Sequence, residues 1–372
     1  MTIFMPMHTA NVVDRHVQEG GCAGAAVVVV KDSEIVLEHY AGEAAPGLAA
    51  ARNVLWPLAS ISKVYTATMI MRLVEEGALT LNMQVSEVIP QFGGEGKQEV
   101  CLRHLLTHTA GMMYEPPEMA ERLKAQTTMS VLLEEAYASP LLFKPGTALS
   151  YADYHYLIAG HMAEIAAGKS YPELMRALVF EPAQLRDSFV APQRSDEKRL
   201  AYVRGVMAEG TEGAMYNSRY ARELAHPAFG VFASASDLAR FGMLFAPGGP
   251  RILSEAGVRT MTTNQTGNVP GQPPLLRGYA ADLRMPWAIG FALQTEQVPS
   301  LYCDLASSHS FAHGGATGCA LVIDPTYDLI VAVVSNAHSS LGVNRWYMRL
   351  HSIVNAAFAQ FTAQAAPMMA EA

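Results

Sequence analysis

The sequence predicts an α/β fold of the α+β type, in which a sheet flanked by helices is combined with a second, mostly helical domain. Two observations lead to this prediction. Strand-like runs occur near both ends of the chain, and apolar residues recur at helical spacing through its middle. A chain of 372 residues, of which 50% are hydrophobic and 16% charged, can bury a large core and form more than one folding unit.

Near the N-terminus, the sequence predicts a β-hairpin. The β-rich runs Val27–Val30 and Ile35–Tyr40 are separated by a turn-like Lys-Asp-Ser. The same pattern returns near the C-terminus, where Ala320–Ile323 and Leu329–Ser335 flank an Asp-Pro-Thr turn. We therefore expect one sheet to contain strands from both ends of the chain.

The middle of the chain has the three- and four-residue apolar spacing of helices. The segments are Val64–Glu76, Ser130–Tyr137, Tyr154–Ala167, Tyr171–Phe180 and Ser236–Phe245. A last helix, at about Arg345–Phe361, would cover one face of the sheet. We therefore assign residues 1–70 and 235–372 to a sheet domain built from both termini, and residues 71–234 to an inserted, mostly helical domain.

Charge and composition exclude several classes of partner. The net charge of −8 and the pI near 5.8 weigh against a nucleic-acid surface. No apolar run is long enough to span a membrane, and the N-terminus lacks the pattern of a signal peptide. We expect a cytoplasmic protein, or a periplasmic one if a leader has been removed, that acts on a small molecule. The four cysteines have no metal-type spacing, so we expect no metal.

The segment WPLASISKVYTATMIMRLVEEG, residues 56–77, places a serine three residues before a lysine at the start of a helical pattern. If Ser60 opens this helix, Lys63 shares its face, whereas Ser62 points elsewhere. A lysine whose charged form is disfavoured by burial can take the proton of a serine hydroxyl and make it nucleophilic. The alternative is structural: Ser60 would cap the helix and Lys63 would be a solvated residue of its first turn.

Two further segments complete a possible active site. Tyr151 stands near the start of a predicted helix, where its phenol can relay a proton to a leaving group. Asp153 is either part of the site or a helix cap. Downstream, His313-Gly314-Gly315 enters a predicted strand, and the backbone N–H groups of Ala316 and Ser60 would form an oxyanion hole. A glycine-rich strand start is equally consistent with a bulge or a tight turn.

With these motifs in this order, the sequence resembles the serine β-lactamase and penicillin-binding-protein superfamily. It is most similar to the class C-like branch that contains family VIII carboxylesterases, D-aminopeptidases and related serine hydrolases. The resemblance covers nearly the whole chain and includes LRHLLTHTAGM at residues 102–112 and FKPGTALSYAD at residues 143–153. It implies a serine β-lactamase-like fold, with an antiparallel sheet flanked by helices, a helical domain, and the site between the two.

Carried over onto this chain, the resemblance makes Ser60 the acylated nucleophile, Lys63 its proton acceptor and Tyr151 a second acid/base. His313-Gly314-Gly315 takes the place of the family's K-T-G. The family uses no metal and no cofactor. We therefore expect a serine hydrolase that forms an acyl-enzyme, most simply a carboxylesterase acting on small neutral esters. The alternatives are an amide hydrolase of the same family (β-lactamase, D-aminopeptidase or DD-peptidase-like), an acyltransferase using the same site, and a non-catalytic binding domain.

Two departures from the family pattern bear on the substrate. The common Y-x-N is Tyr151-Ala152-Asp153 here. An inward-facing Asp153 should hold Lys63 protonated and weaken it as a base, unless Tyr151 takes that role. His313 replaces a lysine, so a substrate carboxylate loses a fixed positive partner. Both changes favour a neutral ester over penicillins and D-Ala-D-Ala peptides.

The remaining candidates have structural explanations. His104 and His108 are four residues apart and could share a metal, but no carboxylate completes an H-E-x-x-H arrangement. The Pro- and Gly-rich segment Asn268–Trp287 reads as a long surface loop of the kind that borders a site. Three aromatic residues are possible acyl-pocket residues and are otherwise ordinary packing residues: Tyr114, Trp287 and Phe291.

Overall fold

Strands from both ends of the chain pair in one sheet, as the sequence predicts. The computed structural model describes residues 8–115, 121–122, 125–205, 215–272, 286–295, 302–339 and 343–363. Within it, β1 (Gly24–Lys31) pairs antiparallel with β12 (Leu329–Ser335). The sheet has seven strands in the order β3-β2-β1-β12-β11-β10-β9. The other five are β2 (Glu34–Ala45), β3 (Leu48–Ala49), β9 (Ala292–Leu293), β10 (Phe311–Gly315) and β11 (Cys319–Asp324).

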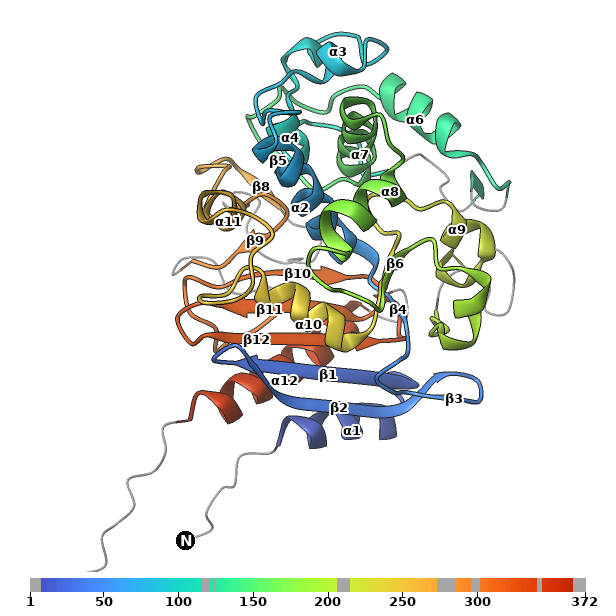
Figure 1. The fold of residues 1–372 in the computed structure, drawn as a ribbon, viewed down its shortest axis with the longest axis vertical. Coiled ribbons are helices and arrows are strands. Elements are labelled where there is room, and N and C mark those ends of the chain that lie inside the picture. Colours follow the sequence, from blue (N-terminus) through green and yellow to red (C-terminus); the bar gives the residue numbers. More distant parts are fainter. Residues whose placement is uncertain are drawn as a thin grey trace, which may run out of the picture.

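Both faces of this sheet are buried, which explains the run of four valines in β1. Successive side chains of a strand point to opposite faces. Val28 and Val30 pack in one hydrophobic cluster, whereas Val27 and Val29 pack in another. On the first face lies α10 (Ala235–Met243), and on the second lie two helices from opposite ends of the chain, α1 (Thr9–Gln18) and α12 (Val343–Phe361) (Figure 1). An unbroken apolar run is the expected pattern for such a strand.

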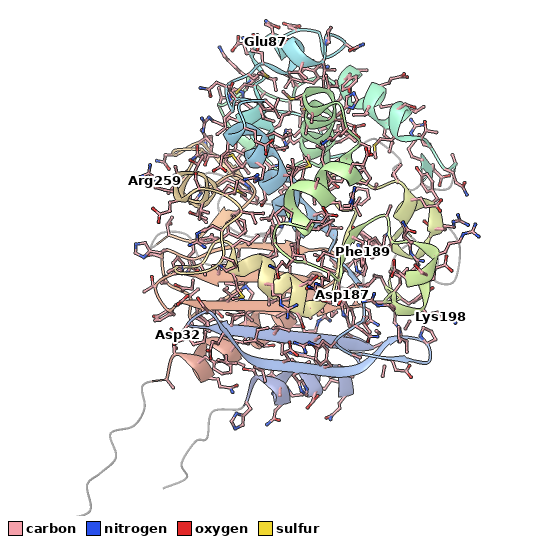
Figure 2. The ribbon with its side chains drawn as sticks, in the orientation of Figure 1. Asp32, Glu87, Asp187, Phe189, Lys198 and Arg259 are labelled. Atoms are coloured by element: carbon pink, nitrogen blue, oxygen red, sulfur yellow. The ribbon has the colours of Figure 1, made fainter. Side chains whose placement is uncertain are left out.

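The helical region is stacked on one edge of this layered part, next to β10 (Figure 1). Its central helix, α2 (Ser62–Glu75), packs against α7 and α8, and most of its side chains are buried. In Figure 2, Glu87 of α3 lies at the outer end of the helical region, far from the sheet, and Asp32 lies at the β1–β2 turn. The other helices are α3 (Val85–Val88), α4 (Leu102–Leu106), α6 (Met129–Ala138), α7 (Asp153–Ala167), α8 (Tyr171–Met175), α9 (Arg219–Glu223) and α11 (Glu255–Thr262).

The structure corrects several predicted elements. The helix predicted to run to Phe180 ends as α8 at Met175 and continues as a π-helical turn, Arg176–Phe180. The helices α1 and α11 were not predicted. Three short strands lie within the region predicted to be helical. Two of them, β6 (Ser188–Val190) and β7 (Val231–Ala233), form a second sheet with β4 (Trp56–Pro57), and the third, β5 (Leu149–Ser150), pairs with β8 (Gly271–Gln272).

The loop predicted at residues 268–287 is only partly described, because residues 273–285 lie outside the described ranges. In the part of the chain that the structure describes, no helix is both long and apolar enough to cross a bilayer. The division of the chain at residues 70 and 234 into two domains remains a prediction.

Candidate active site

Ser60 lies in a short 3₁₀ turn, Ala59–Ile61, that leads directly into α2. The helix itself begins at Ser62, so Ser60 lies in the turn before it and does not open it. Lys63 still reaches back, and its Nζ lies 3.1 Å from the Ser60 Oγ. Ser60 is partly exposed, whereas Lys63 has no exposed surface. The amine can therefore act on the serine while the substrate approaches from the other side.

Ser62, the neighbouring serine, is excluded as the nucleophile by its own contacts. Its hydroxyl oxygen accepts a hydrogen bond from the backbone N–H of Val231 at 2.9 Å, and its side chain is fully buried. Ala59, on the other side of Ser60, has a φ of 46°, which is a left-handed conformation that alanine rarely adopts. Such local strain is common next to reactive residues, where the surrounding structure holds it in place.

Three acceptors surround the Lys63 amine. Its Nζ lies 2.6 Å from the Asp153 Oδ1 and 3.1 Å from the carbonyl oxygen of Ala228, besides its contact with Ser60. A carbonyl can only accept, so the Ala228 oxygen takes an N–H of the amine, while the Asp153 carboxylate faces the amine as an ion pair. The remaining substituent position of the Lys63 nitrogen faces the Ser60 Oγ. In the charged amine this position holds a proton, and in the neutral amine it holds the lone pair. In its neutral form, Lys63 is therefore oriented to accept the Ser60 proton.

Burial is the dominant influence on Lys63. It lowers the pKa of the amine, because the charged form is disfavoured away from water, and the Asp153 carboxylate opposes this by favouring the charged form. The sequence analysis named both effects, but the sequence could not show which of them is larger. Because burial outweighs the carboxylate, the inward-facing Asp153 weakens Lys63 as a base less than expected.

Asp153 is the first residue of α7, and its side chain makes no capping bond to the helix backbone. The side chain is 9% exposed and lies against Lys63. Of the two explanations offered by the sequence, the geometry therefore favours the site over the cap. The backbone N–H of Asp153 donates to the carbonyl oxygen of Tyr114 at 2.7 Å, which holds Tyr114 next to the start of α7.

Tyr151 lies with its ring beside the same amine, 4.8 Å from the Lys63 Nζ to the ring centroid. Its hydroxyl oxygen is buried and has no hydrogen-bond partner among the described residues. Burial raises the pKa of Tyr151 well above its usual value, and the Asp153 carboxylate raises it further, whereas the nearby Ser60 hydroxyl lowers it. The phenol therefore keeps its proton near neutral pH and is set up as a proton donor.

The strand β10 passes close to the turn that carries Ser60, and glycine makes this possible. A Cβ added at Gly315 would overlap the carbonyl oxygen of Leu58, two residues before Ser60. A Cβ at Gly314 would overlap the hydroxyl of Tyr302. Both glycines thus leave room for other parts of the protein. Ala316, the next residue, is partly exposed.

His313 is neutral and presents a free acceptor. Its Nδ1 lies 2.8 Å from the Gly314 carbonyl oxygen, and because that oxygen can only accept, Nδ1 carries the proton. The Nε2 is then a bare acceptor, and it is buried without a partner among the described residues. Burial, with a smaller effect of Lys63, lowers the pKa of His313 to about 3. Its ring lies near those of Tyr151 and Trp287, with centroids 6.1 and 6.0 Å away.

The structure also adds residues that the sequence analysis missed. Glu115 lies near Asp153 and Lys63, and burial raises its pKa to about 7. The Ala228 carbonyl oxygen was missed because any residue type can supply it. Of the proposed pocket aromatics, Phe291 is a fully buried core residue packed on other phenylalanines, whereas Tyr114 and Trp287 lie beside Tyr151. Short sequence patterns carry no signal for contacts that depend on loops.

His104 and His108 do not converge on one point. The His104 Nδ1 accepts the backbone N–H of Cys101 at 3.2 Å, whereas the His108 Nδ1 lies 3.0 Å from the Nδ1 of His155. Among the described residues, no three His, Cys, Asp or Glu side chains are grouped so that they could hold a metal ion.

Comparisons with known proteins agree with this fold and site. The chain is 26% identical to penicillin-binding protein 4 of Amycolatopsis lactamdurans, covering 84% of this chain and 80% of that protein. It is 25% identical to esterase EstB of Burkholderia gladioli, covering 87% and 88% respectively. Its structure is similar to that of EstCE1, described as a hydrolase with promiscuous acyltransferase activity, with a TM-score of 0.75, 20% identity, and coverage of 93% and 97%.

The model of the Beta-lactamase family matches residues 9–352, which is nearly all of the chain. The serine and lysine at the start of α2, the tyrosine before α7 and the strand β10 all fall within this match. The chain belongs to the beta-lactamase family, and it is a serine hydrolase of the β-lactamase and penicillin-binding-protein type.

Proposed function

We propose that the protein is a carboxylesterase that forms an acyl-enzyme at Ser60 and acts on small neutral esters. The observation that carries the choice of substrate is the state of His313, which is neutral near pH 7 and offers an acceptor at Nε2. A neutral His313 supplies no positive charge to attract a substrate carboxylate. An ester without a charged group loses nothing at this position.

In the first half of the reaction, Lys63 accepts the Ser60 proton and the Ser60 Oγ attacks the ester carbonyl carbon. The negative charge that develops on the carbonyl oxygen would be held by the backbone N–H groups of Ser60 and Ala316. The bond to the alkoxy oxygen then breaks. Tyr151 donates its proton to the departing alkoxide, and Lys63 returns a proton to Tyr151, so that the alcohol leaves neutral.

In the second half, water attacks the acyl carbon in place of the alcohol. Its proton passes to Lys63, and the bond between the acyl carbon and the Ser60 Oγ breaks as Ser60 regains a proton. The carboxylic acid leaves and the site returns to its initial state. The same groups act in both halves because the second half is chemically the reverse of the first, with water as the alcohol.

The position of Asp153 weighs against the aminopeptidase alternative. A substrate amine would need a free carboxylate, but the Asp153 side chain is 9% exposed and is paired with Lys63. The relatives are compatible with an esterase and with an amide hydrolase, since one of them is an esterase and another is a penicillin-binding protein. Transfer of the acyl group to an alcohol is also compatible with this site, because water and alcohols attack the same acyl-enzyme.

The experiment is to compare turnover of p-nitrophenyl butyrate with turnover of a penicillin, by the wild type, by Ser60→Ala and by Ser62→Ala. We expect rapid ester hydrolysis by the wild type, a loss of at least about 1000-fold in Ser60→Ala, and activity retained in Ser62→Ala. The penicillin should be turned over slowly or remain attached. Rapid penicillin turnover with little ester cleavage would replace the esterase by a β-lactamase, and a larger loss in Ser62→Ala would refute the assignment of Ser60.

A further inference from the structure

We propose that His108, held in place by His155, is a positioning residue that sets the orientation of the Tyr151 phenol. The inference rests on the proposed function, in which Tyr151 gives its proton to the leaving alcohol. Neither histidine has a part in the chemistry described above. Both side chains are fully buried in the helical region, directly behind Tyr151.

His108 holds the backbone on both sides of Tyr151. Its carbonyl oxygen accepts the N–H of Ser150 at 2.9 Å, and its Nδ1 accepts the N–H of Ala152 at 3.2 Å. The residue has a φ of 60°, a left-handed conformation that lets its carbonyl and its ring face the same segment. The two bonds fix the backbone of Tyr151 and with it the point from which the phenol projects.

The ring of Tyr151 is held as well. The His108 ring lies against it, with centroids 4.2 Å apart and planes tilted by 32°. Trp287 meets both rings edge-on, at 5.2 Å from His108 and 5.9 Å from Tyr151. Among the described residues, the Tyr151 hydroxyl lies near the Ser60 hydroxyl but forms no hydrogen bond of normal geometry, so these ring contacts contribute to directing the phenol.

His155 fixes the protonation of His108. The Ala152 N–H can only donate, so the His108 Nδ1 carries no proton. The His155 Nδ1, 3.0 Å away, must then be the donor to it. Burial lowers the pKa of His155 to about 3 and that of His108 well below its usual value, so both rings stay neutral and this arrangement persists across the working range. A leucine at position 155 would remove the bond between the two rings, and a leucine at position 108 would remove both that bond and the bond from the Ala152 N–H.

The test uses esters of one acid with alcohols of different acidity: p-nitrophenyl, phenyl and ethyl butyrate. Proton donation by Tyr151 matters most when the alkoxide is a poor leaving group. In His108→Leu, we expect kcat/KM to fall by about 10- to 100-fold for ethyl butyrate and by less than about threefold for p-nitrophenyl butyrate. Tyr151→Phe should show the same selectivity, and adding His108→Leu to it should change little.

A second pair of variants separates positioning from simple packing. Asparagine places an acceptor where the Nδ1 of histidine lies and tolerates a left-handed φ, so His108→Asn should stay within about threefold of the wild type on all three esters. His155→Leu should show the selectivity of His108→Leu in weaker form. It also carries the test if His108→Leu does not fold. Val354→Ala, which opens a cavity beneath α12, controls for lost stability.

Equal losses for all three esters in His108→Leu and His155→Leu would overturn the proposal, as would an equal loss in His108→Asn and His108→Leu. A selectivity of the same size in Val354→Ala would also overturn it. Failure of the proposed function looks different: the wild type itself would cleave all three esters poorly, or ester turnover would survive in Ser60→Ala, whatever the histidine variants do.

Discussion

At the scale of single residues, the site depends on how Lys63 is kept able to accept a proton. Its amine is fully buried, which lowers its pKa, and two carboxyl groups oppose that effect, Asp153 more strongly than Glu115. A protonated lysine cannot take the Ser60 proton. The lower end of the pH range for activity should therefore follow the pKa of Lys63, and should move when either carboxyl group is changed.

Asp153→Asn tests this balance. The substitution removes the carboxylate that favours charged Lys63 more strongly, so the pKa of Lys63 falls. The acidic limb of the kcat/KM profile should therefore move to lower pH, by roughly one pH unit. Glu115→Gln should move it in the same direction by less. The measurement is the pH profile of ester hydrolysis for the three proteins. A shift to higher pH in Asp153→Asn would contradict the account of Lys63.

The sequence predicted the identity of these residues better than their surroundings. Ser60, Lys63 and Tyr151 were found because their spacing and order are specific. The tautomer of His313 and the raised pKa of Glu115 could not be predicted, since both depend on which loops bury them. The burial of a side chain depends on the whole fold, so a short sequence pattern does not predict how far burial shifts its pKa.

At the scale of elements, the site exists because β10 approaches the turn that carries Ser60. Only the absence of a side chain at Gly315 lets the strand lie against the Leu58 carbonyl. The strand β9 pairs with β10 only at Phe311 and Ala312, so the next residues of β10 are not covered by it. The sequence showed a glycine-rich strand start, but it could not show what approached it.

Gly315→Ala should therefore separate the strand from the nucleophile turn. We expect a loss of about 1–3 kcal/mol in the free energy of unfolding, as for other overpacked sites, together with a loss of at least about tenfold in kcat/KM for esters. Gly93→Ala is the matched control, because a Cβ there meets no atom within 4 Å. Urea unfolding and ester kinetics on both variants give the answer. Unchanged activity in Gly315→Ala would show that the close approach is not required.

At the scale of the whole molecule, the sheet was predicted from its strands because a strand buried on both faces must be apolar throughout. The valine run of β1 and the matching run of β12 carry that signal. The fold also buries histidines to an extent that the sequence could not predict. Burial lowers the pKa of each of three of them, His155, His226 and His313, to about 3.

These histidines should make the protein sensitive to acid. Below pH 6.5 these histidines bind protons in the unfolded chain but stay neutral in the folded chain. The free energy of unfolding is therefore highest above that pH and falls as the pH drops toward 3. The slope is about 1.4 kcal/mol per pH unit for each histidine. Urea unfolding between pH 7.5 and 4.5 measures it. His226→Asn should reduce the slope and the exposed His309→Asn should not, and an equal slope in His226→Asn would count against this explanation.

The most direct test of the account is the site of acylation. The protein would be mixed briefly with p-nitrophenyl butyrate, quenched in acid and measured by intact-mass spectrometry, and the modified peptide would then be sequenced. The account predicts one butyryl group per chain, attached to Ser60, and no adduct in Ser60→Ala. An adduct on Ser62 or elsewhere, or ester turnover by Ser60→Ala at the wild-type rate, would contradict it.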